Sequence, residues 1–545
     1  MLKKRILVNL ALILMLLVSS TQITLAGPGG GGARAGNGFT SATNAAAPTL
    51  QPVSPLPKGK PNIVFILADD LDYAEFQYMP NLKALIAAQG VTFHNYFVSM
   101  SLCCPSRATT LRGQYPHNTQ ILGNQLPSGG FQKFYQLGED KSTIAVWLQA
   151  AGYHTMLAGK YLNGYPDQNN LMYIPPGWNE WYVAVHGNAY TEYNYTLNEN
   201  GKQVPYGNKP ADYGTDVYVH KAVDFIQRSA KANEPFFVYL APYAPHAPYT
   251  PAPRHATLFP GVKAPRTPNY DEADVSDKPL YIRDRSLLNP RQINFIDAVY
   301  RKRLQALQAV DEGIAAIVNT LKANGQFDNT YIFFTSDNGY HLGNHRQVVG
   351  KIAPYEEELR VTMMVRGPGV PTGKTLEQIA GNIDLAPTWA ALAGAKTPDF
   401  VDGRSLVPLL RANPPALTEW RHAFSLENGF DQIVNTKVIT PNTDLGLLEP
   451  QDQDEIDMSA LAAPQRPKRA VPPFRGVRLQ NLSYVEYVTG EKELYDLRTD
   501  PYQLQNLAAK ANPHLLALLA ARVKELATCK AAACRAAEDA PFKFP

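Results

Sequence analysis

The sequence predicts an α/β fold, in which a largely parallel sheet is covered by helices on both faces. Two observations carry this prediction. Continuous apolar runs recur along the chain, such as Asn62–Leu67 and Thr330–Phe334, and a strand of this kind is buried on both faces. Amphipathic stretches with helical spacing separate the runs, the longest being Gln292–Ala323. Strands that alternate with helices in this way are typical of parallel sheets.

The expected elements follow one another from residue 61 onward. Apolar runs predict strands at Asn62–Leu67, His154–Leu157, Pro235–Leu240, Thr330–Phe334 and Val361–Val365. Amphipathic spacing predicts helices at Leu82–Ile86, Thr143–Ala151, Asp216–Arg228 and Gln292–Ala323, and one more that opens at Asp384. The α/β pattern therefore continues to about residue 412.

Beyond residue 413 the pattern changes. Leu482–Thr489 and Glu493–Leu497 lie on either side of a Gly-Glu turn, which predicts a hairpin, and His514–Leu526 predicts a terminal helix. The segment Thr443–Arg469 is first acidic and then basic, and we interpret it as a solvated loop. We therefore expect a larger α/β domain over residues 61–412 and a smaller antiparallel α+β domain over 413–545.

The N-terminus has the pattern of an export signal. Basic residues at positions 3–5 precede an apolar run, Ile6–Val18, and small residues lead to a cleavage site after Ala26. This predicts a secretory signal peptide over residues 1–26, because the apolar run is too short to span a membrane. Residues 27–60, rich in Gly, Ala and Pro, predict a flexible linker. We expect an exported protein, extracellular or periplasmic, with no membrane attachment after signal cleavage.

Four cysteines form two close pairs, Cys103 with Cys104 and Cys529 with Cys534. Four cysteines allow three connectivities in principle, but adjacent residues rarely bond to each other. In an exported chain we expect a Cys529–Cys534 disulfide that closes a short loop. The alternative is two free thiols on a terminal helix.

The stretch Cys103–Gly113 has the features of an anion site. It reads C-C-P-S-R-A-T-T-L-R-G, which suits a loop entering a helix because Pro105 falls near the first turn, where no needed donor is lost. Amides at a helix N-terminus favour an anion, and Arg107 adds a planar donor fork that matches a tetrahedral oxyanion. We expect a binding site for sulfate or phosphate here. The alternative is a buried structural thiol beside a surface arginine.

Polar residues follow four of the expected strands. Asp69-Asp70, Lys160, His246 and Asp337-Asn338 each come after an apolar run, and ligands in open α/β sheets bind at the carboxyl ends of the strands. Singly, each motif could be a turn, a helix cap or a hydrogen-bonded loop residue. Jointly they predict that these side chains meet at one edge of the sheet. The three aspartates and Asn338 offer only oxygen ligands, which favour calcium or magnesium over zinc. The formal net charge of +3 is too small to indicate a nucleic-acid partner.

The Cys103 stretch resembles the type I sulfatase signature C-x-P-S-R-x-x-x-L-x-G, with Cys104 in the variable second place. The resemblance implies an alkaline-phosphatase/sulfatase-like fold and conversion of Cys103 to formylglycine, whose hydrate is the nucleophile, by a formylglycine-generating maturation enzyme. It also implies one divalent ion, usually calcium with magnesium as the alternative. The implied metal ligands are Asp69, Asp70, Asp337, Asn338 and the converted Cys103.

The same resemblance assigns cations and acids around the sulfate. Lys160 matches a sulfate-binding lysine, and Lys351, in G-K-x-x-x-Y-E-E-E-L-R-V, matches a late one; the alternative for Lys351 is a surface lysine pairing with Glu356 or Glu357. His246, in A-P-H-A-P, matches the family's strand-end histidine, which would protonate the leaving oxygen. Many sulfatases have a histidine two residues after the first lysine, where this chain has Leu162. His341 is the candidate for that missing base.

Other stretches, such as G-K-Y-L-N-G-Y and F-I-D-A-V-Y-R-K-R, resemble the branch that contains N-acetylglucosamine-6-sulfatases and extracellular heparan 6-O-endosulfatases. This implies hydrolysis of 6-O-sulfate esters on the glucosamine of heparan-type glycans, a sulfated carbohydrate substrate. Two alternatives remain. One is a phosphate or phosphonate monoester hydrolase of the same superfamily, and the other is a non-catalytic binder of sulfated glycans.

Overall fold

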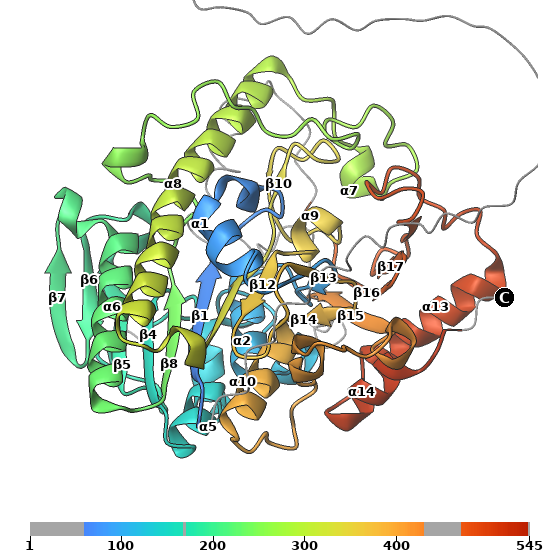
Figure 1. Ribbon diagram of the computed structural model, residues 1–545. Coiled ribbons are helices and arrows are strands. Elements are labelled where there is room, and N and C mark those ends of the chain that lie inside the picture. Colours follow the sequence, from blue (N-terminus) through green and yellow to red (C-terminus); the bar gives the residue numbers. More distant parts are fainter. Residues whose placement is uncertain (1–58, 167–169, 430–469, 543–545) are drawn as a thin grey trace, which may run out of the picture. The chain divides into compact units, whose positions relative to one another are not determined.

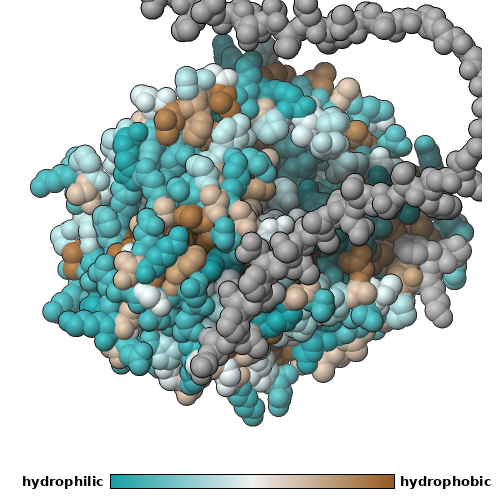
Figure 2. Space-filling view, viewed as in Figure 1, coloured by the Kyte–Doolittle hydropathy of each residue, from teal (hydrophilic) through white to brown (hydrophobic). Residues whose placement is uncertain are grey.

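The computed structural model describes residues 59–166, 170–429 and 470–542. The expected signal peptide (1–26), nearly all of the expected linker (27–60) and the whole of Thr443–Arg469 lie outside these residues. Within the described ranges, no helix is both long and apolar enough to cross a bilayer. The face drawn in Figure 2 is mainly hydrophilic, with hydrophobic residues in small separate groups.

A mixed sheet forms the centre of the described part of the chain (Figure 1). Its order is β13-β2-β12-β9-β1-β8-β4-β5-β6-β7. The strands are β1 (Asn62–Ala68), β2 (Val91–Phe93), β4 (His154–Gly159), β5 (Glu180–Gly187), β6 (Tyr195–Glu199), β7 (Lys202–Tyr206), β8 (Phe236–Ala241), β9 (Thr330–Ser336), β12 (Met363–Arg366) and β13 (Lys374–Leu376). The central run from β9 to β5 is parallel, whereas β12, β6 and β7 pair antiparallel with their neighbours. The predicted α/β class is confirmed.

Helices cover both faces of the sheet, as the continuous apolar runs predicted. Alternate residues of β1 enter different hydrophobic clusters: Ile63, Phe65 and Leu67 belong to one, and Val64, Ile66 and Ala68 to the other. The first cluster contains residues of α2 (Cys103–Arg112), α5 (Ile144–Ala150) and α10 (Leu385–Ala393). The second contains residues of α6 (Gly214–Ala232) and α8 (Pro290–Ala323). Side chains of a strand alternate between faces, so this division places a helical layer on each side.

Helix α8 begins two residues before the predicted start because of its cap. Asn289 Oδ1 accepts hydrogen bonds from the amides of Arg291 and Gln292, and Gln292 Oε1 accepts one from the amide of Asn289. This reciprocal arrangement satisfies amides that have no partner inside the helix, and Pro290 suits the first helical position.

Shorter elements connect these layers. The helices are α1 (Pro80–Leu82), which continues as a π-helical turn (Lys83–Ala87), α3 (Pro116–Thr119), α4 (Gly130–Gln136), α7 (Leu280–Arg283) and α9 (Glu356–Leu359). Strand β3 (Tyr96–Phe97) pairs with β14 (Ala380–Gly381), and β10 (His341–Leu342) pairs with β11 (Val349–Gly350). The β10–β11 hairpin brings two candidate site segments together, because it pairs His341 with Gly350, the residue before Lys351.

A second sheet is antiparallel, with the order β15 (Ala423–Asn428), β16 (Phe474–Leu479), β17 (Leu482–Tyr487), β18 (Lys492–Asp496). The predicted hairpin is β17–β18, and the predicted terminal helix is α13 (Pro513–Leu526), followed by α14 (Ala532–Asp539). The expected Cys529–Cys534 disulfide is present and joins the segment after α13 to α14. The division into domains at residue 412 stays a prediction.

The insertion β5–β7 was not predicted. Strand β5 contains a continuous apolar run, residues 181–185, that the prediction missed. In contrast, β6 and β7 mix apolar and polar residues, and β7 is largely exposed. Antiparallel pairing with one face open to solvent explains this pattern.

The short helix α3 packs against the C-terminal part of the chain through His117. Its Nδ1 lies 2.8 Å from Glu427 Oε1, and its Nε2 lies 3.0 Å from the carbonyl oxygen of Cys529. Both neighbours only accept hydrogen bonds, so the ring is best satisfied as a cation. Burial acts to lower the pKa of His117, but the Glu427 carboxylate outweighs it and raises the pKa to about 9.

This pair predicts a pH-dependent stability. Because the folded-state pKa of His117 lies above the unfolded value, its contribution is fully present below about pH 6.5 and is lost as the pH rises towards about 9. We expect His117→Gln to remove up to about 3 kcal/mol of stability below pH 6.5 and progressively less above it. Urea denaturation at a series of pH values measures this. The same change at His220, which is exposed, is the control, and an effect of His117→Gln that does not vary with pH would contradict the assignment.

Candidate active site

Four strand ends bring the candidate residues to one edge of the sheet. Asp69 and Asp70 follow β1, Lys160 follows β4, His246 comes after β8, and Asp337 with Asn338 follows β9. These strands are neighbours and parallel, in the order β9-β1-β8-β4. Their carboxyl ends therefore meet at the same edge. All six side chains are buried, with exposed fractions of 3% or less.

The carboxylates and Asn338 form a connected cluster. The Asp70 amide donates to Asp337 Oδ1 at 3.1 Å, and Asn338 Nδ2 donates to Asp70 Oδ1 at 2.7 Å. Asp70 itself has a left-handed backbone, with φ of 66°, which turns the chain sharply after β1. Three anionic side chains are thus held together away from water.

Three cations compensate these buried charges. Arg107 Nε lies 2.7 Å from Asp337 Oδ2, Lys160 Nζ lies 2.7 Å from Asp69 Oδ2, and Lys351 Nζ lies 2.7 Å from Asp70 Oδ1. Arg107 is 1% exposed and Lys351 is 7% exposed. The alternatives of a surface arginine at 107 and a surface lysine at 351 are therefore wrong.

The balance of burial and charge differs among the three carboxylates. Burial raises the pKa of Asp69 to about 6, even though Lys160 lies against it. Burial acts in the same direction on Asp70, but Lys351 outweighs it and holds the pKa of Asp70 below its ordinary value. The pKa of Asp337 is also lowered, because Arg107 outweighs burial.

Cys103 lies at the N-terminus of α2, beside this cluster. Its Sγ is 2.9 Å from Lys351 Nζ, 3.6 Å from Asp69 Oδ1 and 3.8 Å from Asp70 Oδ1. Cys104 belongs instead to the hydrophobic cluster beneath the sheet. The two adjacent sulfurs thus have different surroundings, and only Cys103 lies among the charged groups.

His246 lies at the margin of the cluster, and His341 lies in β10, opposite the residue before Lys351. His246 Nδ1 is 2.9 Å from the carbonyl oxygen of Ala247, which fixes Nδ1 as a donor, and its Nε2 is 3.5 Å from Asp70 Oδ2. Nε2 is therefore the ring nitrogen that faces Asp70. His341, on β10, is buried, and its Nδ1 lies 2.8 Å from Glu358 Oε1.

The donor set fits a divalent ion. One ligand atom from each of Asp69, Asp70, Cys103 and His246 can be chosen so that all lie within 4.8 Å of one another, so this group could hold a metal. The first three are expected ligands, whereas His246 is not, and the expected ligand Asp337 is not in this group. In addition, Asn338 Oδ1 is buried and accepts no hydrogen bond within the described part of the chain. A buried carbonyl oxygen without a hydrogen-bond donor, next to carboxylates, is suited to a hard cation such as calcium or magnesium.

Comparison with known proteins identifies the group to which this site belongs. The family model described as Sulfatase matches residues 61–395. The chain belongs to the sulfatase family. It is a sulfuric ester hydrolase, and the sulfatase-like fold expected from the sequence is confirmed.

Individual relatives place this sulfatase in one branch. N-acetylglucosamine-6-sulfatase of Capra hircus is 36% identical over 485 residues, which cover 87% of this chain and 85% of that protein. The extracellular sulfatase SULF-1 homolog of Drosophila melanogaster is 37% identical over 68% of this chain and 33% of that protein. A protein solved in complex with its substrate, D-glucosamine-2-N,6-O-disulfate, has a TM-score of 0.70 at 23% identity, covering 89% of this chain and 100% of that one. At this identity the last match shows the fold alone.

Sequence reasoning missed two residues next to the site. Tyr190, in the β5–β6 connection, lies 4.7 Å from the His246 ring and 4.9 Å from Lys160 Nζ, measured from its ring centroid. Arg303, in α8, donates to the carbonyl oxygen of Asp70. No local signal marked Tyr190, whereas Arg303 stands in the stretch F-I-D-A-V-Y-R-K-R that supported the resemblance.

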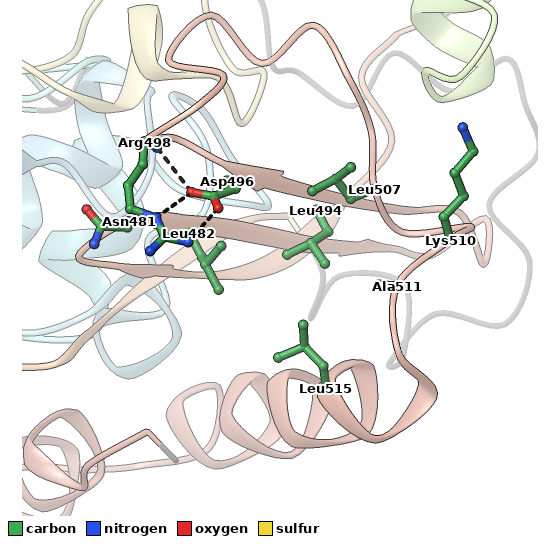
Figure 3. Close-up of a pocket in the computed structure, with 9 residues that line it drawn as sticks. All are labelled: Asn481, Leu482, Leu494, Asp496, Arg498, Leu507, Lys510, Ala511 and Leu515. Carbon is green, nitrogen blue, oxygen red and sulfur yellow. Dashed lines mark hydrogen bonds and ion pairs between the residues drawn. The ribbon is translucent and has the colours of Figure 1, made fainter. Parts of the chain in front are cut away.

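The pocket drawn in Figure 3 lies elsewhere. It is lined by leucines of β17, β18 and α13 and by the Asp496–Arg498 ion pair. No candidate site residue lines it.

The position of Lys160 depends on Gly159, which predicts an outcome for one substitution. Gly159 has φ of 107°, and a Cβ there would lie 1.9 Å from the carbonyl oxygen of Ala241, which accepts the Lys160 amide. We expect Gly159→Ala to cost about 3 kcal/mol or more in stability and to lower turnover by displacing Lys160. Gly201 is the control, because it has φ of 89° but nothing within 4 Å of its Cβ position. Gly201→Ala should therefore cost only the backbone strain, about 1 kcal/mol, without the steric clash expected at Gly159. Equal losses of stability and turnover in the two variants would contradict this account.

Proposed function

We propose that this sulfatase removes 6-O-sulfate from glucosamine or N-acetylglucosamine residues of heparan-type glycans, with formylglycine made from Cys103 as nucleophile. One observation supports Cys103 as the position of the nucleophile. Its Sγ lies at a helix N-terminus, 2.9 Å from Lys351 Nζ and within 4 Å of two carboxylates. The substrate class is supported by 36% identity to an N-acetylglucosamine-6-sulfatase over most of both chains.

The proposed metal ligands are Asp69, Asp70, Asp337, Asn338 and the converted Cys103, with calcium as the expected ion and magnesium as the alternative. When bound, the ion would polarise the sulfate oxygens and lower the pKa of the aldehyde hydrate. Arg107, Lys160 and Lys351 supply further positive charge. Their side chains balance the carboxylates and the developing charge on the sulfate.

The proposed reaction begins when one hydroxyl of the hydrated aldehyde at position 103 gives its proton to a neighbouring carboxylate, Asp69 or Asp70. The resulting oxyanion attacks sulfur. The bond from sulfur to the sugar oxygen breaks, and His246 gives its Nε2 proton to that oxygen, with Lys351 nearby to stabilise the charge. A base then removes the proton of the second hydroxyl. The carbonyl re-forms, sulfate leaves through cleavage of the bond between carbon and oxygen, and water restores the hydrate.

His341 is the proposed base for the second step, in place of the histidine that Leu162 replaces. Its Nδ1 faces the Glu358 carboxylate at 2.8 Å, so Nε2 would accept the proton. The β10–β11 pairing places His341 opposite Gly350, next to Lys351. A histidine oriented by a carboxylate is a common form of general base.

The proposal includes export of the chain. A leader-like segment precedes the described residues, and the relatives include an extracellular sulfatase. Outside the cytoplasm, the chain would meet its glycan substrate after a formylglycine-generating enzyme has acted on Cys103.

Peptide mass spectrometry and a substrate panel test the proposal together. In a host with a formylglycine-generating enzyme, we expect an aldehyde at Cys103 and a thiol at Cys104. Turnover of glucosamine 6-sulfates should exceed that of 2-O-sulfates, 3-O-sulfates and matched phosphate esters. Cys103→Ala should abolish turnover, whereas Cys104→Ala, in the variable place of the signature, is the control.

Each outcome of this test has a distinct meaning. A thiol at Cys103 in cells that convert a control sulfatase would contradict the nucleophile and favour the glycan-binding alternative. A converted enzyme that prefers phosphate esters would favour the phosphate or phosphonate monoester alternative. A converted enzyme with no preference for the 6-sulfate would contradict the substrate alone.

For His341→Ala, we expect a large loss of steady-state turnover, about 100-fold or more, with the first step preserved. Sulfated enzyme should then accumulate, and intact-mass measurement after mixing with substrate detects it. Glu358→Gln should give a smaller effect of the same kind. Full turnover in His341→Ala, with no sulfated enzyme trapped, would show that another group is the base.

A further inference from the structure

Arg303 is a fully buried cation in the middle of α8, outside the set of residues that the sulfatase signature identifies. Its side chain is 0% exposed. Its guanidinium donates through Nε and Nη2 to the two oxygens of Glu75, each at 2.7 Å, and through Nη2 to the carbonyl oxygen of Asp70 at 2.5 Å. It therefore connects the long helix directly to the backbone of a candidate metal ligand.

The bonded carbonyl belongs to a residue with an unfavourable backbone. Asp70 has φ of 66°, a left-handed conformation that is unfavourable for most L-residues. This conformation lets the Asp70 amide donate to Asp337 Oδ1 while its own carboxylate faces Lys351, Asn338 and Cys103. A conformation of this kind persists only when surrounding contacts fix it.

Glu75 fixes the guanidinium in turn. Burial by itself would lower the pKa of Arg303, but the Glu75 carboxylate outweighs burial and raises it. The fork of the guanidinium meets the two Glu75 oxygens and leaves Nη2 directed at the Asp70 carbonyl as well. A lysine has no planar fork and could not make these contacts in the same geometry.

Arg303 also contacts two other loops of the site. Its guanidinium carbon lies 4.3 Å from the ring centroid of Tyr340 and 5.9 Å from that of Tyr249, and the two hydroxyls are 3.0 Å apart. Tyr340 follows Asn338 by two residues, and Tyr249 follows His246 by three. One side chain thus touches the segments that follow β1, β8 and β9.

We propose that Arg303 is a positioning residue, which holds the Asp70 carboxylate in the geometry that a divalent ion requires. The inference rests on the metal site of the proposed function but goes beyond it, because Arg303 is not itself a ligand. Groups that orient metal ligands typically change metal affinity by about 10- to 100-fold when they are replaced.

Calcium affinity of the purified full-length protein, measured by isothermal titration calorimetry, tests this directly. We expect Arg303→Lys and Arg303→Met to weaken calcium binding by at least about tenfold. The calcium concentration needed for half-maximal activity should rise by the same factor, and Arg303→Lys should recover much of its turnover at saturating calcium. Glu75→Gln should weaken binding in the same direction but less.

Arg366 provides a matched control. It is also buried, donates to the carbonyl oxygens of Phe327 and Thr330, and lies 3.7 Å from the Phe327 ring centroid. However, Thr330 begins β9, at the opposite end of the strand from Asp337. Arg366→Lys and Arg366→Met should therefore lower thermal stability and leave calcium affinity unchanged.

The outcomes separate this inference from the proposed function. If the wild-type protein binds no calcium or magnesium, the metal site of the proposed function is wrong. If the wild type binds calcium and folded Arg303→Lys and Glu75→Gln bind it equally well, Arg303 has no positioning role. Equal weakening of calcium binding in the Arg366 variants would also overturn the positioning role. The loss of affinity would then result from lower stability and not from the contact between Arg303 and Asp70.

Discussion

The site depends on charge compensation among carboxylates that are buried together. Removing one charge from water costs several kcal/mol even after the protein relaxes, and Asp69, Asp70 and Asp337 are all at most 1% exposed. Each has its own cation, and the three cations come from separate parts of the chain: α2, the end of β4 and the end of β11. The nucleophile position, Cys103, lies where these parts meet.

The sheet explains how so many charged groups are held close together. The strands that precede them are parallel and buried on both faces, so the positions at which the charged residues begin are fixed by the hydrophobic core. The loops themselves are held by polar contacts, such as the bond between the Arg303 guanidinium and the Asp70 carbonyl. Rigid strands set the separation of the groups, and buried hydrogen bonds set their orientation.

Two connections outside the central strands complete the surroundings of the site. The β5–β6 connection brings Tyr190 against both Lys160 and His246, and the β10–β11 hairpin brings His341 beside the strand that precedes Lys351. Neither connection contributes to the central parallel run. The charge cluster suits any tetrahedral oxyanion, so it does not by itself distinguish one ester from another.

The sequence by itself determined the α/β class, the signature around Cys103, the strand ends that carry the candidate ligands and the Cys529–Cys534 disulfide. These features follow from local spacing and residue type, which a sequence displays directly. Only the tertiary structure decided which cation pairs with which carboxylate, that Lys351 and Arg107 are buried, and that Arg303 and Tyr190 reach the site. The reason is physical: such contacts join residues far apart in the chain, as Asn338 and Asp70 are by 268 positions, and burial of a charge depends on partners that no local pattern specifies.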